Sequence, residues 1–144
     1  MREILTYPIE AAEIREELLF VLEYFRARGH SSCEVLFGWA WGNDYYPTDE
    51  WAYRTCDLGS VLPEVERAEQ AGWGKLGQDD LYLKFPTLDL EFRFCNDSDL
   101  HISFDQASDV VESFYSRWKA RGFSPAEWAK RSDGSSPGER IRIN

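Results

Sequence analysis

The two histidines of the chain are the first residues to consider for catalysis, because a nucleophilic serine or cysteine needs a base within hydrogen-bonding reach. His30 lies in the segment GHSSC, three residues before Cys33. Cys33, however, falls on the apolar face of a predicted strand, and nearness in sequence does not supply the geometry of a catalytic pair. We therefore predict no catalytic residue in this segment.

The second histidine belongs to the segment NDSDLHISFD, in which Asp97, Asp99 and His101 occupy alternate positions. Alternate side chains of an extended chain point the same way, so two carboxylates and an imidazole would converge, and such a set can hold a divalent ion. Aspartate and asparagine are also the residues that satisfy the backbone of a tight turn. We interpret the segment as a turn without a bound metal or cofactor, and a metal site is the alternative.

The stretch WAWGNDYYPTDEWAY, residues 39–53, interleaves six aromatic residues with three acidic ones. Trp39 and Trp41 continue the alternation of a predicted strand, so we expect both in the core. The rest is typical of a surface loop, where tyrosine and tryptophan beside carboxylates anchor the Arg or Lys of a partner. The predicted partner-binding residues are Asp44, Tyr45, Tyr46, Asp49, Glu50 and Trp51.

No other motif indicates catalysis. Asp89 and Glu91 lie on the predicted solvent face of a strand, and an exposed carboxylate keeps an ordinary pKa, which does not suit a general acid at neutral pH. The glycines match neither the G-x-G-x-x-G nor the P-loop spacing. We predict a non-enzymatic protein without a cofactor; the alternative is a small-molecule or metal-dependent enzyme or ligand-binding domain.

Apolar periodicity predicts the elements that position these residues. Helical spacing and helix-end signals indicate long helices near 9–28, 60–71 and 106–121, and a capping box at Ser124–Glu127 indicates a short last helix. Alternating apolar residues indicate strands near 2–6, 33–41, 51–58, 80–85, 88–95 and 100–105.

This order of elements predicts an α+β fold. We expect a mostly antiparallel sheet of four to six strands, including a three-strand meander at about 80–105, packed by a long N-terminal helix and a long C-terminal helix. Residues 1–131 are expected to form a single domain, and the polar residues 132–144 a tail.

Charge and cysteine content restrict the partners and the compartment. The 144 residues carry a net charge of −10, and residues 34–112 alone hold seventeen Asp/Glu against five Lys/Arg. Such a surface repels phosphate backbones and anionic lipid, so we expect neither nucleic acid nor membrane as a partner. Three widely spaced cysteines form no disulfide framework, and we find neither a signal peptide nor a long apolar run, so a cytoplasmic location is expected.

Together these features predict a domain that presents an acidic, aromatic surface to a basic protein partner. In its small size, strong acidity and 15% aromatic content the chain is similar to the bacterial immunity proteins that neutralise partner toxins, a likeness of composition that covers no motif. That likeness implies a toxin as the basic partner. A homo-oligomer whose exposed aromatic residues form the subunit interface is a further alternative.

Overall fold

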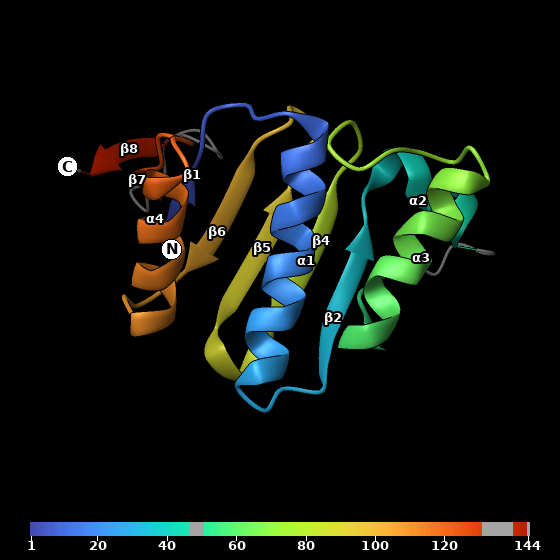
Figure 1. The fold of residues 1–144 in the computed structure, drawn as a ribbon, viewed down its shortest axis with the longest axis horizontal. Helices are drawn as coiled ribbons and strands as arrows, with labels where there is room; N and C mark the ends of the chain where they lie inside the picture. Colours follow the sequence, from blue (N-terminus) through green and yellow to red (C-terminus); the bar gives the residue numbers. More distant parts are fainter. Residues whose placement is uncertain (47–50, 131–139, 144) are drawn as a thin grey trace.

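One antiparallel sheet runs through the protein, and helices cover one of its faces (Figure 1). The computed structural model describes residues 1–46, 51–130 and 140–143. Its helices are α1 (Ala11–Ala27), α2 (Trp39–Tyr45), α3 (Leu58–Gln70) and α4 (Asp109–Ala120), with a 3₁₀ turn at Pro86–Leu88. Its strands are β1 (Arg2–Leu5), β2 (Ser32–Phe37), β3 (Arg54–Asp57), β4 (Leu81–Phe85), β5 (Leu90–Phe94), β6 (Leu100–Phe104), β7 (Ala126–Lys130) and β8 (Arg140–Ile143). The predicted α+β class is confirmed.

The strands follow the order β3-β2-β4-β5-β6-β1-β7-β8 across the sheet. The meander β4-β5-β6 is present as predicted. The N-terminal strand β1 lies inside the sheet, where Ile4 pairs with Ile102 of β6 on one side and with Glu127 of β7 on the other. The residues that the structure describes thus form eight strands, and the expected four to six was wrong because β7 and β8 were not foreseen.

The segment after α4 departs most clearly from the prediction. Ser124 has a φ of 52°, and the chain then forms β7 instead of the short helix that the capping box predicted. Without β7, one edge of β1 would have unpaired backbone groups, and β7 supplies their partners while Glu127 forms an ion pair with Arg2. Within the expected tail, Arg140–Ile143 form β8 and pair with β7, while 131–139 lie outside the described residues.

Strand β2 ends at Phe37, and helix α2 begins at Trp39, inside the segment predicted to be one strand. A Cβ atom at Gly38 would lie 2.7 Å from the Cβ of Asp80, so only glycine permits this close approach to the start of β4. Phe37 and Trp41 are in contact, with ring centroids 4.8 Å apart. Trp41 is buried as expected, but Trp39 is 68% exposed, and its predicted core position was wrong.

Aromatic rings fill the layer between the helices and the sheet. Phe25 of α1 stacks on Phe85 of β4 with ring centroids 3.9 Å apart, and Phe114 of α4 meets Phe92 of β5 at 4.9 Å. Such contacts contribute beyond the area that they bury, and they fix the helices above the central strands. The loops at the strand ends are positioned by this packing.

A carboxylate is buried within the helix layer. Glu17 of α1 is completely buried, and it accepts hydrogen bonds from Arg117 at 2.7 Å, from Trp118 Nε1 at 2.8 Å and from Arg121 at 2.7 Å. A buried charge is tolerated when it is paired and hydrogen-bonded in this way. The cluster ties α1 to α4.

The opposite face of the sheet bears no helix in the described part of the chain (Figure 1). Polar side chains lie on it. Tyr82, Arg93 and His101 form one row across β4, β5 and β6. None of the described helices has the length and hydropathy that a bilayer-spanning segment requires.

Candidate functional site

The segment predicted to bind a partner begins with helix α2, and two tryptophans lie exposed on it and just after it. Trp39 is 68% exposed and Trp51 is 43% exposed, and their ring centroids are 5.1 Å apart. Trp51 is fixed in place because its Nε1 donates a hydrogen bond to the carbonyl of Phe37 at 2.6 Å. The predicted surface position of Trp51 is confirmed, and sequence analysis missed Trp39 as its neighbour.

Tyr45, the last residue of α2, and Tyr46, which follows it, are packed more deeply than predicted. Tyr46 is only 5% exposed, and its hydroxyl accepts a hydrogen bond from the backbone N–H of Phe37 at 3.0 Å, so its expected surface position was wrong. Tyr45 stacks on Phe37 with ring centroids 4.0 Å apart and donates a hydrogen bond to Glu64 of α3 at 2.8 Å. Burial, together with the neighbouring Glu64 carboxylate, raises the pKa of Tyr45 to about 12. The tyrosines therefore support the candidate surface from below, and they are not exposed anchors on it.

Of the three acidic residues predicted to bind a partner, the structure describes only Asp44. Asp44 lies on α2 with its side chain exposed, as expected. Asp49 and Glu50 lie outside the described residues, so their expected positions stay a prediction.

A cavity of about 700 Å³ opens beside these residues, between α2, α3 and the edge strand β3. Its aromatic lining comes from Phe37, Tyr45, Tyr46 and Trp73, and its acidic lining from Asp44, Asp57 and Glu64. Cavities of this size and mixed lining are typical of sites that bind small ligands or single side chains of a partner.

Two arginines of the protein itself lie over the rings of this cavity. The guanidinium carbon of Arg67 is 5.4 Å from the Tyr45 ring centroid and 5.3 Å from that of Trp73, and Arg67 pairs with Glu64 at 2.9 Å. Arg54 of β3 lies 5.1 Å from the Tyr46 ring centroid. Ring faces beside a carboxylate therefore accommodate a guanidinium group at this site.

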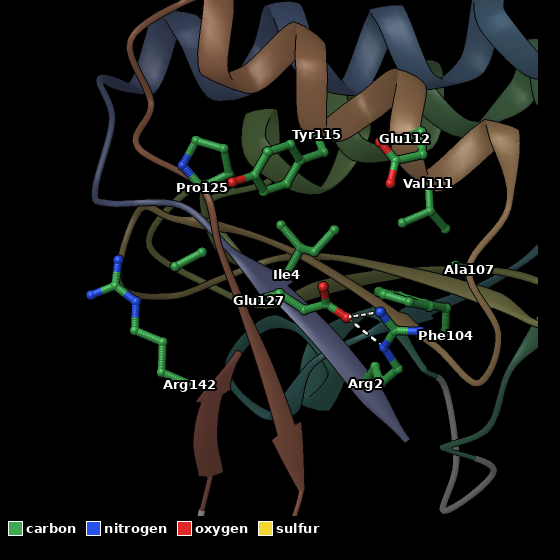
Figure 2. A pocket seen from close by; sticks show the side chains of 11 residues that line it. Arg2, Ile4, Phe104, Ala107, Val111, Glu112, Tyr115, Pro125, Glu127 and Arg142 are labelled. Carbon is green, nitrogen blue, oxygen red and sulfur yellow. Dashed lines mark hydrogen bonds and ion pairs between the residues drawn. The ribbon is translucent and has the colours of Figure 1, made fainter. Parts of the chain in front are cut away.

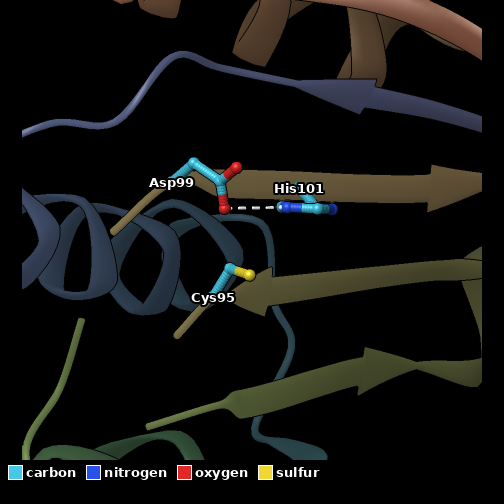
Figure 3. A group of neighbouring side chains, drawn as sticks. All are labelled: Cys95, Asp99 and His101. Atoms are coloured by element: carbon cyan, nitrogen blue, oxygen red, sulfur yellow. Dashed lines mark hydrogen bonds and ion pairs between the residues drawn. The ribbon is translucent and has the colours of Figure 1, made fainter. Parts of the chain in front are cut away.

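The second predicted group, at the turn between β5 and β6, is only partly brought together (Figure 3). His101 Nε2 lies 2.8 Å from Asp99 Oδ1, and Cys95 joins them, with the ligand atoms of the three side chains all within 4.8 Å of one another. Asp97 is exposed in the turn and is not part of this group. Sequence analysis missed Cys95, although its place at the end of a strand paired with that of His101 was a usable signal.

The imidazole of His101 lies among acidic side chains. His101 is only 4% exposed, and its Nδ1 lies 3.6 Å from Oε2 of the buried Glu3 in β1. Burial alone lowers the pKa of His101, but its hydrogen bond with Asp99 and its interactions with the nearby Cys95 and Glu3 outweigh it and raise that pKa to about 10. Burial raises the pKa of Asp99, and its hydrogen bond with His101 more than offsets this effect. The metal-free group is therefore an imidazolium shared between carboxylates.

The remaining candidate pair from the sequence is not assembled for nucleophilic catalysis. Cys33 is buried, and burial raises the pKa of its thiol to about 12, so the thiolate is scarce at neutral pH. The ring of His30 packs against Phe25 with centroids 5.6 Å apart. That the segment holds no catalytic pair stays a prediction.

A smaller cavity of about 300 Å³ lies between α4 and the strands β1 and β7 (Figure 2). Arg2 and Glu127 are paired at its floor, while Glu112 and Tyr115 face it from α4. Arg142 of β8 also lines this cavity.

Comparisons with known proteins add no assignment. No protein-family model matches the chain, and neither a search of curated proteins nor a search of solved structures finds a match.

Proposed function

We propose that this protein binds a basic segment of a protein partner through the surface formed by α2, Tyr46, Trp51, β3 and α3. The observation that carries the proposal is the pair of exposed tryptophans, Trp39 and Trp51, which are in mutual contact. Trp39 lies on the same helix as Asp44 and Tyr45, which line the acidic and aromatic cavity. Exposed aromatic clusters of this kind are typical of interaction surfaces, and tryptophan is enriched among the residues that dominate binding energy.

The charges beside the tryptophans favour a cationic ligand group. Asp44 and Asp57 are exposed at the cavity, and the chain as a whole carries a net charge of −10. The contact of Arg67 with Glu64 and two rings supports this proposal, since an incoming Arg or Lys would make a contact of the same kind. Complementary charge of this kind speeds association and selects the partner.

Inhibition of a bacterial toxin is the specific version of this function that we propose. The small, acidic and aromatic chain supports it, since such an inhibitor covers a basic surface of its toxin. The partner would contribute at least one Arg or Lys to the cavity beside α2.

The test uses the full chain and synthetic peptides of one length in three classes: rich in Arg and Lys, uncharged, and rich in Asp and Glu. Tryptophan fluorescence reports binding. We expect the basic peptides alone to bind, with an affinity that falls as salt is added. Trp39→Ala should weaken this binding at least about tenfold, whereas the control Tyr7→Ala, also at a residue that is 68% exposed but lies away from the site, should leave it unchanged.

Two results would contradict the proposal. One is equal binding of the acidic and basic peptides; the other is a Trp39→Ala variant that binds the basic peptides as tightly as the unchanged chain. Since the Trp39 side chain is 68% exposed, its removal should not disturb the fold.

A small-molecule ligand is the second candidate function, and the cavity of about 700 Å³ is the observation that favours it. A ligand that binds only the folded chain raises its melting temperature. A thermal-shift screen of metabolites with a clear stabilising compound, together with no binding of any peptide class, would replace the first proposal with this one.

A further inference from the structure

We propose that Cys95, Asp99 and His101 form a zinc-binding site at the turn between β5 and β6. One thiol, one carboxylate and one imidazole are brought together there, with their ligand atoms all within 4.8 Å of one another (Figure 3). Cys95 is 3% exposed and His101 is 4% exposed, so the group is enclosed by the protein and is not an acidic patch on the surface.

The backbone of the turn holds the three ligands in place. The Cys95 N–H donates to the carbonyl of Asp99 at 3.0 Å, and the Ser98 N–H donates to the carbonyl of Cys95 at 3.1 Å, which closes a tight hairpin. The pairing of β5 with β6 continues beyond the hairpin, where Arg93 lies opposite His101. The ligands therefore come from a short, fixed loop and not from a mobile surface.

The kinds of donor atom select the metal. Thiolate and imidazole together favour zinc over magnesium or calcium, which prefer oxygen ligands. Zinc bonds of about 2.0–2.3 Å in tetrahedral geometry separate neighbouring ligand atoms by roughly 3.3–3.6 Å. Asp99 Oδ1 and His101 Nε2 are 2.8 Å apart and would move apart by less than about 1 Å to admit the ion. The ligand atoms of the group, which lie within 4.8 Å of one another, would close to the same spacing around it.

The carboxylate of Glu3 lies near Nδ1 of His101, the ring nitrogen that would not bind the metal. His101 Nδ1 makes no hydrogen bond in the structure, and Glu3 Oε2 lies 3.6 Å from it. Histidines that bind zinc through one ring nitrogen commonly donate the other N–H to a carboxylate, which fixes the tautomer. Glu3 is thus a positioning residue, and it would hold Nε2 toward Cys95 and Asp99.

Zinc binding at this site replaces protons, and the charges balance accordingly. The thiol of Cys95 gives up one proton, and the imidazolium of His101 gives up the proton on Nε2, both to solvent. The ion takes their place between Cys95, Asp99 and Nε2 of His101. Arg93, which also faces the group, is paired with Asp80 at 3.2 Å. Three protein ligands leave a fourth position for water.

The test is a titration of the metal-stripped full chain with zinc by calorimetry, and with cobalt as a spectroscopic substitute. We expect one ion per chain and an absorption band from a bond between cobalt and a thiolate. Cys95→Ser should abolish this band and weaken zinc binding at least about 100-fold, and Glu3→Gln should weaken zinc binding about 10- to 100-fold. Circular dichroism establishes that each variant is folded.

Two control variants make the assignment specific. Asp97→Asn lies in the same turn but outside the group, and it should bind zinc as the unchanged chain does. Cys33→Ser with Cys56→Ser removes the other thiols and should keep the cobalt–thiolate band. No zinc uptake by the unchanged chain, or a band that persists in Cys95→Ser, would overturn the proposal.

Discussion

Two groups of buried charge, one on each side of the sheet, differ in how completely they are satisfied. On the helix side, Glu17 accepts hydrogen bonds from two arginines and one tryptophan, all within 3.1 Å. On the other side, Asp99 and Glu3 share the imidazole of His101, at 2.8 Å and 3.6 Å. The first group is a closed clamp between two helices, whereas the second leaves a ring nitrogen without a hydrogen bond.

The difference separates a structural charge from an exchangeable one. The arginines around Glu17 remain charged at any pH at which the protein folds, and removing the carboxylate would leave them facing each other. The single cation of the second group is a proton on an imidazole, which a metal ion can replace. Burial alone therefore does not distinguish a clamp from a site; the kind of counter-charge does.

The largest expected loss of stability follows from removing the Glu17 carboxylate that ties α1 to α4. Glu17→Gln should lower the free energy of unfolding by about 3 kcal/mol, because Arg117 and Arg121 lose the carboxylate that both contact. Chemical denaturation at neutral pH measures this loss. The control is Glu16→Gln on the same helix, whose side chain is 60% exposed and whose ion pair with Arg121 should contribute less than about 1 kcal/mol. Similar losses in the free energy of unfolding for both variants would show that the buried Glu17 contributes no more to stability than the exposed Glu16.

A smaller and pH-dependent effect is expected at the imidazole. His101→Gln should lower the free energy of unfolding by about 2 kcal/mol at neutral pH. Because folding raises the pKa of His101 from 6.5 to about 10, its contribution is fully present below pH 6.5 and is lost as pH rises toward 10. The difference in stability between the unchanged chain and the variant should therefore shrink across that range in denaturation curves. A constant difference would mean that the imidazolium is not the stabilising form.

The smallest effect is expected at the thiol in the absence of metal. Cys95→Ser in the presence of a chelator should cost no more than about 1 kcal/mol, since a hydroxyl can take over the contact of Sγ with the side chain of Asn96 at 3.4 Å. Thermal denaturation with and without zinc measures it. If the loss with chelator equals that of His101→Gln, the thiol belongs to the packing of the charge group and its conservative replacement is no clean test of zinc binding.

The candidate surface was only partly accessible from sequence. The aromatic and acidic content of residues 39–53 indicated where to look, and the exposure of Asp44 and Trp51 followed from their setting. The exposure of Trp39 and the burial of Tyr46 could not be predicted from the sequence. The alternation of apolar residues predicted a strand through this segment. A helix begins after Gly38 instead, and it leaves Trp39 exposed while Tyr46 is buried. The close approach of Asp80 that requires this glycine is a tertiary contact, which the local sequence does not reveal.

Local patterns in the sequence determined the elements whose stability is mostly local. The apolar stripe of α1, ended by Gly29 with a φ of 88°, and the alternation along β4, β5 and β6 were sufficient to predict these elements and the α+β class. Only the tertiary structure decided the rest. A segment with helix-start signals forms β7 because it pairs with the edge of β1, which is far from it along the chain. The register of β5 against β6 brings Cys95 to His101, because it is fixed by backbone groups that meet across a turn.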